Sequence, residues 1–134
     1  IGNDTIPDTK LDFNLLHVLA VDDNPESLRV LKLYFESQGG KLITADSGKE
    51  ALSLVEKDTF DLILMDMQMP EMDGLETTKR IRTLGNIKKR TPVIALTANA
   101  MPGDKEMCLR AGMNDYLTKP VDLDELRKIL QKWL

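Results

Sequence analysis

Residues 61–74 of this chain read DLILMDMQMPEMDG. An apolar run from Leu62 to Met65 ends there in the carboxylate of Asp66, and a loop with Pro70 follows. An unpaired charge is expensive to bury, so a carboxylate at the end of an apolar run needs a compensating partner. We therefore interpret the run as a buried strand and Asp66 as a candidate for chemistry.

Around this stretch the chain alternates apolar runs with amphipathic segments five times. Asn24 before Pro25 supplies a capping side chain and a prefixed helical φ, which predicts a helix start. Ser47 and Asp73 each open a capping box. The predicted strands are 17–21, 41–45, 60–65, 92–96 and 115–117. The predicted helices are 25–38, one that opens at 48 and turns Ala51, Leu52 and Val55 inward, 74–84, 101–111 and 122–134, with a basic loop at 85–90.

Strict alternation, with strands apolar on both faces, predicts an α/β fold: a doubly wound, five-stranded parallel sheet with helices on both faces. Ligands of such sheets bind beyond the carboxyl ends of the strands. We expect the polar residues at those ends to converge on one edge. They are Asp22, Asp23, Asp66, Thr97 and Lys119.

Composition narrows the class of protein. With 134 residues, 42% hydrophobic and 30% charged, the chain fits one globular domain. Its net charge of -4 gives no basic face, so we expect no direct nucleic-acid partner. No apolar run approaches the roughly 20 residues that span a bilayer, and no signal-peptide layout opens the chain. A single Cys108 excludes an internal disulfide, and a reducing, cytoplasmic setting is expected.

Three carboxylates at one edge repel one another, and a hard divalent cation with oxygen ligands is the chemistry that tolerates them. Mg²⁺ accepts one or two carboxylates together with phosphate oxygens, with Mn²⁺ as an alternative ion. Lys119 offers an ammonium to a phosphate oxygen or to Asp66, and Thr97 offers a hydroxyl. If Asp66 is a nucleophile, its product is an aspartyl phosphate.

Four fragments resemble the signatures of the receiver domains of two-component response regulators. They are VDDN (21–24), MDMQMPEMDG (65–74), TAN (97–99) and YLTKP (116–120), in order and at the usual spacing. The resemblance covers residues 17–134 and leaves 1–16 as a linker. It implies a flavodoxin-like fold with sheet order 2-1-3-4-5. It also implies that Asp66 accepts a phosphoryl group from a histidine of a sensor kinase or of a histidine phosphotransfer domain.

The same resemblance implies the roles at the metal. Asp23, Asp66 and the backbone carbonyl of Gln68 hold Mg²⁺, while Asp22 assists through water. Lys119 pairs with Asp66 and later with the phosphoryl group.

For the phosphoryl group and the readout, the resemblance implies that the Thr97 hydroxyl and the backbone amides of Gln68 and Ala98 receive the remaining oxygens. Tyr116 is similar to the family's switch aromatic, which turns inward when Thr97 moves toward the phosphate. The bond before Pro120 is expected to be cis.

We therefore expect a phosphorylation-operated switch in a phosphorelay, a monomer that promotes its own phosphorylation and slow dephosphorylation and is not a turnover enzyme. The last predicted helix reaches Leu134, so we expect no effector domain after it. The linker and the stretch MDMQMPEMDG resemble those found in receivers of hybrid sensor histidine kinases. That would make the chain a cytoplasmic part of a membrane-bound kinase. A stand-alone receiver is the alternative.

Two other functions stay open. One is a Mg²⁺-dependent hydrolase working through an aspartyl phosphate, as in haloacid-dehalogenase-like phosphatases. Those enzymes carry a second aspartate two residues after the nucleophile, where this chain has Gln68. The other is a receiver-like binding module that never accepts phosphate. Such modules usually lack an acid, the acceptor or the lysine, and this chain has them all.

Overall fold

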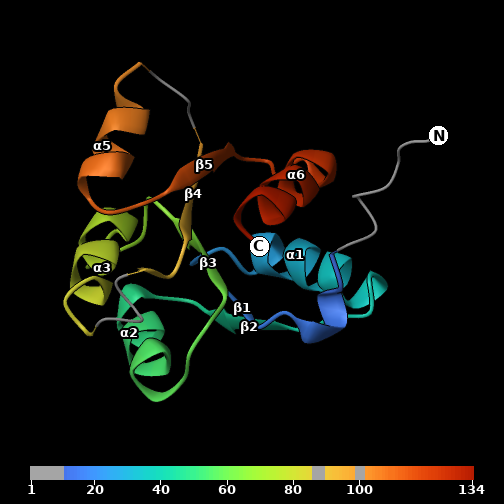
Figure 1. Ribbon diagram of the computed structural model, residues 1–134. Helices are drawn as coiled ribbons and strands as arrows, with labels where there is room; N and C mark the ends of the chain where they lie inside the picture. The colour runs from blue at the N-terminus through green and yellow to red at the C-terminus, as the bar shows by residue number, and fades with distance from the viewer. Residues whose placement is uncertain (1–10, 86–89, 99–101) are drawn as a thin grey trace.

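The computed structural model describes residues 11–85, 90–98 and 102–134 of the chain. Within these ranges, five strands form one parallel sheet in the order β2-β1-β3-β4-β5, which confirms the predicted flavodoxin-like topology (Figure 1). The strands are β1 (Val18–Val21), β2 (Leu42–Ala45), β3 (Leu62–Asp66), β4 (Val93–Thr97) and β5 (Asp115–Thr118). The helices are α1 (Pro25–Ser37), α2 (Gly48–Lys57), α3 (Gly74–Ile81), α5 (Asp104–Arg110) and α6 (Leu123–Trp133), with a 3₁₀ turn, η2 (Phe13–Leu15), before β1.

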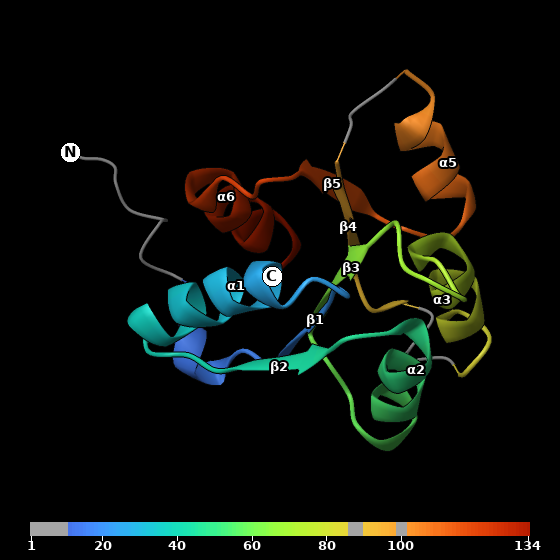
Figure 2. The same cartoon turned by 180° about the vertical axis from the view of Figure 1, so that it is seen from behind.

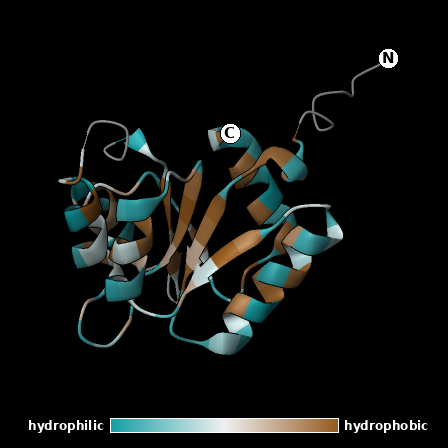
Figure 3. Ribbon diagram, turned by 90° about the horizontal axis from the view of Figure 1, so that it is seen from below, coloured by the Kyte–Doolittle hydropathy of each residue, from teal (hydrophilic) through white to brown (hydrophobic). Residues whose placement is uncertain are grey.

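Helices cover both faces of the sheet, as predicted. α1 and α6 lie on one face, and α2, α3 and α5 lie on the other (Figure 1, Figure 2). Val18 and Ala20 pack into the core beneath α1 and α6, whereas Leu19 and Val21 pack into the core on the opposite face. This double burial explains why the strands are apolar throughout while the helices show polar outer faces (Figure 3).

Capping hydrogen bonds confirm the predicted starts of α2 and α3. Ser47 Oγ accepts a hydrogen bond from the Glu50 amide at 3.1 Å at the start of α2. Asp73 Oδ1 accepts one from the Glu76 amide at 2.8 Å at the start of α3. Each bond satisfies an amide that the first helical turn leaves without a backbone partner.

The strands are displaced slightly from their predicted bounds. β3 includes Asp66, which pairs with Leu96, and β4 includes Thr97, which pairs with Thr118. Backbone groups form the ladder, so a polar side chain does not end it. β4 begins at Val93 and not at the predicted Pro92, which has no N–H to donate. The first three strands likewise begin one or two residues later than predicted.

Two helices, α3 and α5, differ from their predicted bounds by more than one residue at an end. α3 ends at Ile81, before the expected Leu84. α5 begins at Asp104, after Gly103 with a left-handed φ of 96°. The predicted start of that helix at 101 and residues 86–89 of the predicted basic loop lie outside the described residues. Among the described residues, no helix combines the length and the hydropathy needed to cross a membrane.

Part of the predicted linker packs onto the sheet. Phe13 is 4% exposed, and its ring meets those of Tyr34 and Phe35 edge-on, with centroids 5.8 and 5.4 Å apart. Gly40 makes room for it, because a Cβ there would lie 2.8 Å from the Phe13 carbonyl oxygen. The neighbouring Leu15 is 75% exposed.

Arg82 ties three segments together at the end of the sheet where the strands begin. Its guanidinium donates to the carbonyl of Gly112 at 2.9 and 2.6 Å, to the carbonyl of Thr91 at 2.7 Å and to Asn114 Oδ1 at 2.9 Å. The same Asn114 oxygen accepts the Val93 amide at 2.9 Å. Arg82 thereby joins the end of α3 to the starts of β4 and β5.

We expect Phe13→Ala to lower the free energy of unfolding by about 2–4 kcal/mol, because it empties a buried aromatic site. Leu15→Ala, in the same turn, should change it by less than about 0.5 kcal/mol. Urea unfolding of both variants measures the difference. If Phe13→Ala lowers the free energy of unfolding as little as Leu15→Ala does, the turn does not contribute to the folded core.

We expect Arg82→Ala to cost about 2–4 kcal/mol, since buried carbonyls lose a charged donor. Arg80→Ala is the matched control: Arg80 is exposed and forms a surface ion pair with Glu76 at 3.0 Å, so its loss should cost less than about 1 kcal/mol. Thermal unfolding of the two variants tests this, and a comparable loss in both would contradict it.

Candidate functional site

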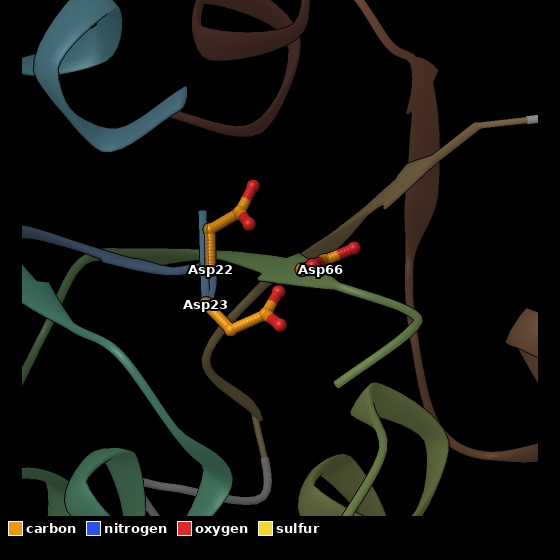
Figure 4. Close-up of side chains that lie close together, drawn as sticks. All are labelled: Asp22, Asp23 and Asp66. Atoms are coloured by element: carbon orange, nitrogen blue, oxygen red, sulfur yellow. The ribbon is translucent and has the colours of Figure 1, made fainter. Parts of the chain in front are cut away.

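The predicted site residues do lie at one edge, where the strands end. Asp22 and Asp23 follow β1, and Asp66 ends the adjacent β3 (Figure 4). The Asp22 amide donates to the Ala45 carbonyl of β2 at 3.1 Å, and Asp22 Oδ1 accepts the Asn24 amide at 2.9 Å. These bonds orient the Asp22 side chain within the sheet edge.

Asp22, Asp23 and Asp66 form the carboxylate cluster. One oxygen of each lies within 4.8 Å of the others. Asp22 is 0% exposed and Asp66 is 4% exposed, whereas Asp23 is exposed. The cluster is therefore buried on one side and open to solvent on the other.

Lys119 supplies the positive charge. Its Nζ lies 2.8 Å from Asp22 Oδ2 and 3.5 Å from Asp66 Oδ1, so Asp22 is a nearer partner than the expected Asp66. The Lys119 amide donates to the Thr97 carbonyl at 2.7 Å, which holds the lysine beside the end of β4. The bond from Lys119 to Pro120 is cis, as predicted.

The electrostatics of the edge favour added positive charge. Burial, then the charge of Asp22, raise the pKa of Asp66 to about 7, against the opposing effects of the Gln68 amide and Lys119. Burial alone would lower the pKa of the Lys119 ammonium, but its hydrogen bond to Asp22 and the charges of both aspartates raise it. One ammonium therefore does not balance the carboxylates beside it.

The predicted phosphoryl-binding residues flank Asp66. The Gln68 amide donates to Asp66 Oδ1 at 3.3 Å. Gln68, Thr97 and Met107 line the same cavity, which has a volume of about 330 Å³. Ala98 follows Thr97 and is exposed.

Tyr116 lies in β5, directly beside β4. It pairs with Ala95, two positions before Thr97, and is half-buried against the core beneath α2, α3 and α5. This places it on the strand next to Thr97. His17 lies away from the site, because it precedes β1 at the opposite end of the sheet, where its Nε2 is 3.4 Å from Asp58 Oδ2.

The residue-by-residue prediction missed the close approach of Gly74 to the backbone of Asp66. Gly74 is the first residue of α3 and is buried, and a Cβ there would overlap the Asp66 carbonyl oxygen. The sequence shows a glycine at the end of the stretch 61–74, but the residues that Gly74 contacts can be identified only in the folded chain.

Comparison with known proteins agrees with this geometry. A family model described as the response regulator receiver domain matches residues 18–131. The sensor histidine kinase GacS of Pseudomonas protegens is 40% identical over 129 residues, which are 95% of this chain and 14% of the kinase. The chain thus spans about one seventh of the length of that curated relative.

Two solved structures are also similar. The receiver domain of the sensor histidine kinase PA1611 from Pseudomonas aeruginosa, which has a magnesium ion coordinated in its active site cleft, is 43% identical with a TM-score of 0.80, over 88% of this chain and 96% of that one. The receiver domain of the Saccharomyces cerevisiae response regulator Ssk1, in complex with the histidine phosphotransfer protein Ypd1, gives a match that is 32% identical, with a TM-score of 0.82, over 90% of each chain. With its fold and the family match together, this chain belongs to the response regulator receiver domains of two-component signalling systems.

Proposed function

We propose that this receiver domain accepts a phosphoryl group on Asp66 from a histidine of a sensor kinase or of a histidine phosphotransfer domain. The observation that carries the proposal is the carboxylate cluster with Lys119 beside it at the carboxyl edge of the sheet. Two neighbours support it, since one binds magnesium in its cleft and the other is in complex with a phosphotransfer protein.

The cluster fits Mg²⁺. Its donors are all oxygen, the ligand type that this ion prefers, and the exposed Asp23 leaves room for the waters that Mg²⁺ retains. Asp22 Oδ2 is buried and pairs with Lys119 Nζ at 2.8 Å. Asp23, Asp66 and the Gln68 carbonyl would hold the ion, and Asp22 would act through water. When bound there, Mg²⁺ would neutralise charge on the transferring group.

In the transfer, an oxygen of ionised Asp66 forms a bond to phosphorus while the bond from phosphorus to the donor histidine nitrogen breaks, and the nitrogen keeps the electron pair. The Thr97 hydroxyl and the amides of Gln68 and Ala98 orient the phosphoryl oxygens. Lys119, already 3.5 Å from Asp66, turns to a phosphoryl oxygen. Positioning and electrostatics provide most of the acceleration.

The readout runs through Thr97 and Tyr116, on adjacent strands. Thr97 moves toward the phosphoryl group, Tyr116 turns inward, and the surface formed by α5, β5 and α6 changes. Phosphorylation can bias this equilibrium only through contacts that differ between the two conformations.

We propose residues 17–134 as the receiver domain, with 11–16 packed onto it, inside a hybrid sensor kinase at the cytoplasmic side of a membrane. The similarity to GacS supports this parent, and a stand-alone receiver is the alternative. The domain itself is not a turnover enzyme, because Gln68 occupies the position where a hydrolase of this chemistry needs a general acid.

Incubation with Mg²⁺ and a small-molecule phosphodonor tests acceptance directly. Intact mass should show one phosphoryl addition in the wild type and in Asp46→Asn, an exposed carboxylate after β2, and none in Asp66→Asn. Rapid multiple turnover of the donor would indicate a hydrolase. A folded protein that gains no mass with a competent donor would indicate a binding module and contradict the proposal.

In chelator, stability should fall as pH rises from about 4 to about 7. The folded state raises the pKa of Asp66 to about 7, so it binds more protons than the unfolded chain across this window. Asp66→Asn removes that decline and should raise the free energy of unfolding by on the order of 1–3 kcal/mol at pH 8, with a smaller gain at pH 5.

Urea unfolding at the two pH values, with Asp46→Asn as the exposed control, provides the measurement. Mg²⁺ at pH 8 should stabilise the wild type more than Asp66→Asn, by linkage to binding. If Asp66→Asn is no more stable than the wild type at pH 8, repulsion among the carboxylates of the cluster does not destabilise the folded state.

A further inference from the structure

Gly74 lies against the backbone of the phosphoacceptor itself. A Cβ at this position would overlap the Asp66 carbonyl oxygen and would lie 3.0 Å from both the Asp66 carbonyl carbon and Met67 Cα. Gly74 is buried, and its φ is not in the left-handed region. It is therefore close approach of two backbones, and not an unusual dihedral angle, that requires glycine here.

Backbone hydrogen bonds hold the peptide after Asp66 on two sides, so it cannot shift to accommodate a side chain at position 74. Asp66 ends the central strand of the sheet and pairs with Leu96, and the Met67 amide donates to the Leu96 carbonyl at 3.0 Å. On the other side, the Gly74 amide donates to the Met67 carbonyl at 3.0 Å. The peptide between Asp66 and Met67 is thus held between β4 and the first residue of α3.

The loop between Met67 and Gly74 is tightly turned. Glu71 adopts a left-handed φ of 69°, which is uncommon for a residue other than glycine. The Met72 amide donates to the Pro70 carbonyl at 2.7 Å, which closes a tight turn. A displaced Gly74 would therefore pull on Gln68, two residues beyond Asp66.

We propose that Gly74 is a positioning residue for phosphoryl transfer: its missing side chain lets α3 set the tilt of the peptide after Asp66, and so the direction of the Gln68 amide and carbonyl. This inference rests on the proposed function, in which those two groups meet the phosphoryl oxygens and the metal. The Gln68 amide, 3.3 Å from Asp66 Oδ1, already points at the reacting carboxylate.

The matched control is Gly40. It too is buried without a left-handed φ, and a Cβ there would press on a backbone carbonyl, that of Phe13, at 2.8 Å. Gly40 precedes β2, so it lies at the opposite end of the parallel sheet from Asp66. Gly40→Ala therefore introduces the same kind of collision far from the site.

The test compares Gly74→Ala and Gly40→Ala in three measurements: thermal stability in chelator, Mg²⁺ affinity, and the rate of phosphorylation by a small-molecule donor at saturating Mg²⁺. Both variants should lose stability. Only Gly74→Ala should bind Mg²⁺ several-fold more weakly and react at least 10-fold more slowly, because a misplacement of about 1 Å can cost up to 100-fold in rate.

Rates and affinities that fall equally in the two variants, or in neither, would overturn the inference. If the wild type itself accepts no phosphoryl group, the proposed function fails, and the Mg²⁺ comparison still decides the role of Gly74. If Gly74→Ala does not fold, hydrogen exchange of the wild-type Gly74 amide decides: strong protection supports the rigid contact with Met67, and exchange as fast as in an exposed loop overturns it.

Discussion

The contact of Lys119 with Asp22 and Asp66 is the interaction on which the site depends. Three carboxylates come together at the ends of β1 and β3, and one ammonium from beyond β5 stands between two of them. Burial, and then the charge of Asp22, raise the pKa of Asp66, and the excess of carboxylates leaves the edge in need of a cation. The remaining site residues lie around this charge because each of their strands ends at the same edge.

Much of this arrangement follows from local sequence patterns. Capping residues such as Ser47 and Asp73 mark where helices begin, and uniformly apolar strands indicate a sheet covered on both faces. Parallel strands then bring residues at their carboxyl ends together, so the sequence alone predicts that Asp22, Asp66 and Lys119 lie at one edge. The order of pairing came from the resemblance to a family, since periodicity alone does not select a neighbour.

What local patterns could not predict depends on contacts between distant residues. Arg82 reads as an ordinary charged residue near a helix end, yet its partners Thr91, Gly112 and Asn114 lie 9 to 32 positions away. Gly74 carries no side chain, so its importance appears only when the space around it is known. Phe13 belongs to a segment without periodicity, and only the rings of α1 reveal why it is buried.

The two ends of the sheet differ in the kind of interaction they contain. Where the strands begin, Arg82 satisfies carbonyls from two segments and Phe13 fills a core, so those contacts favour the folded state. Where the strands end, buried carboxylates oppose it. The stability of the domain and the carboxylate cluster therefore depend on separate regions: a substitution near Arg82 can change the free energy of unfolding without touching the cluster, which lies some four or five residues farther along each strand.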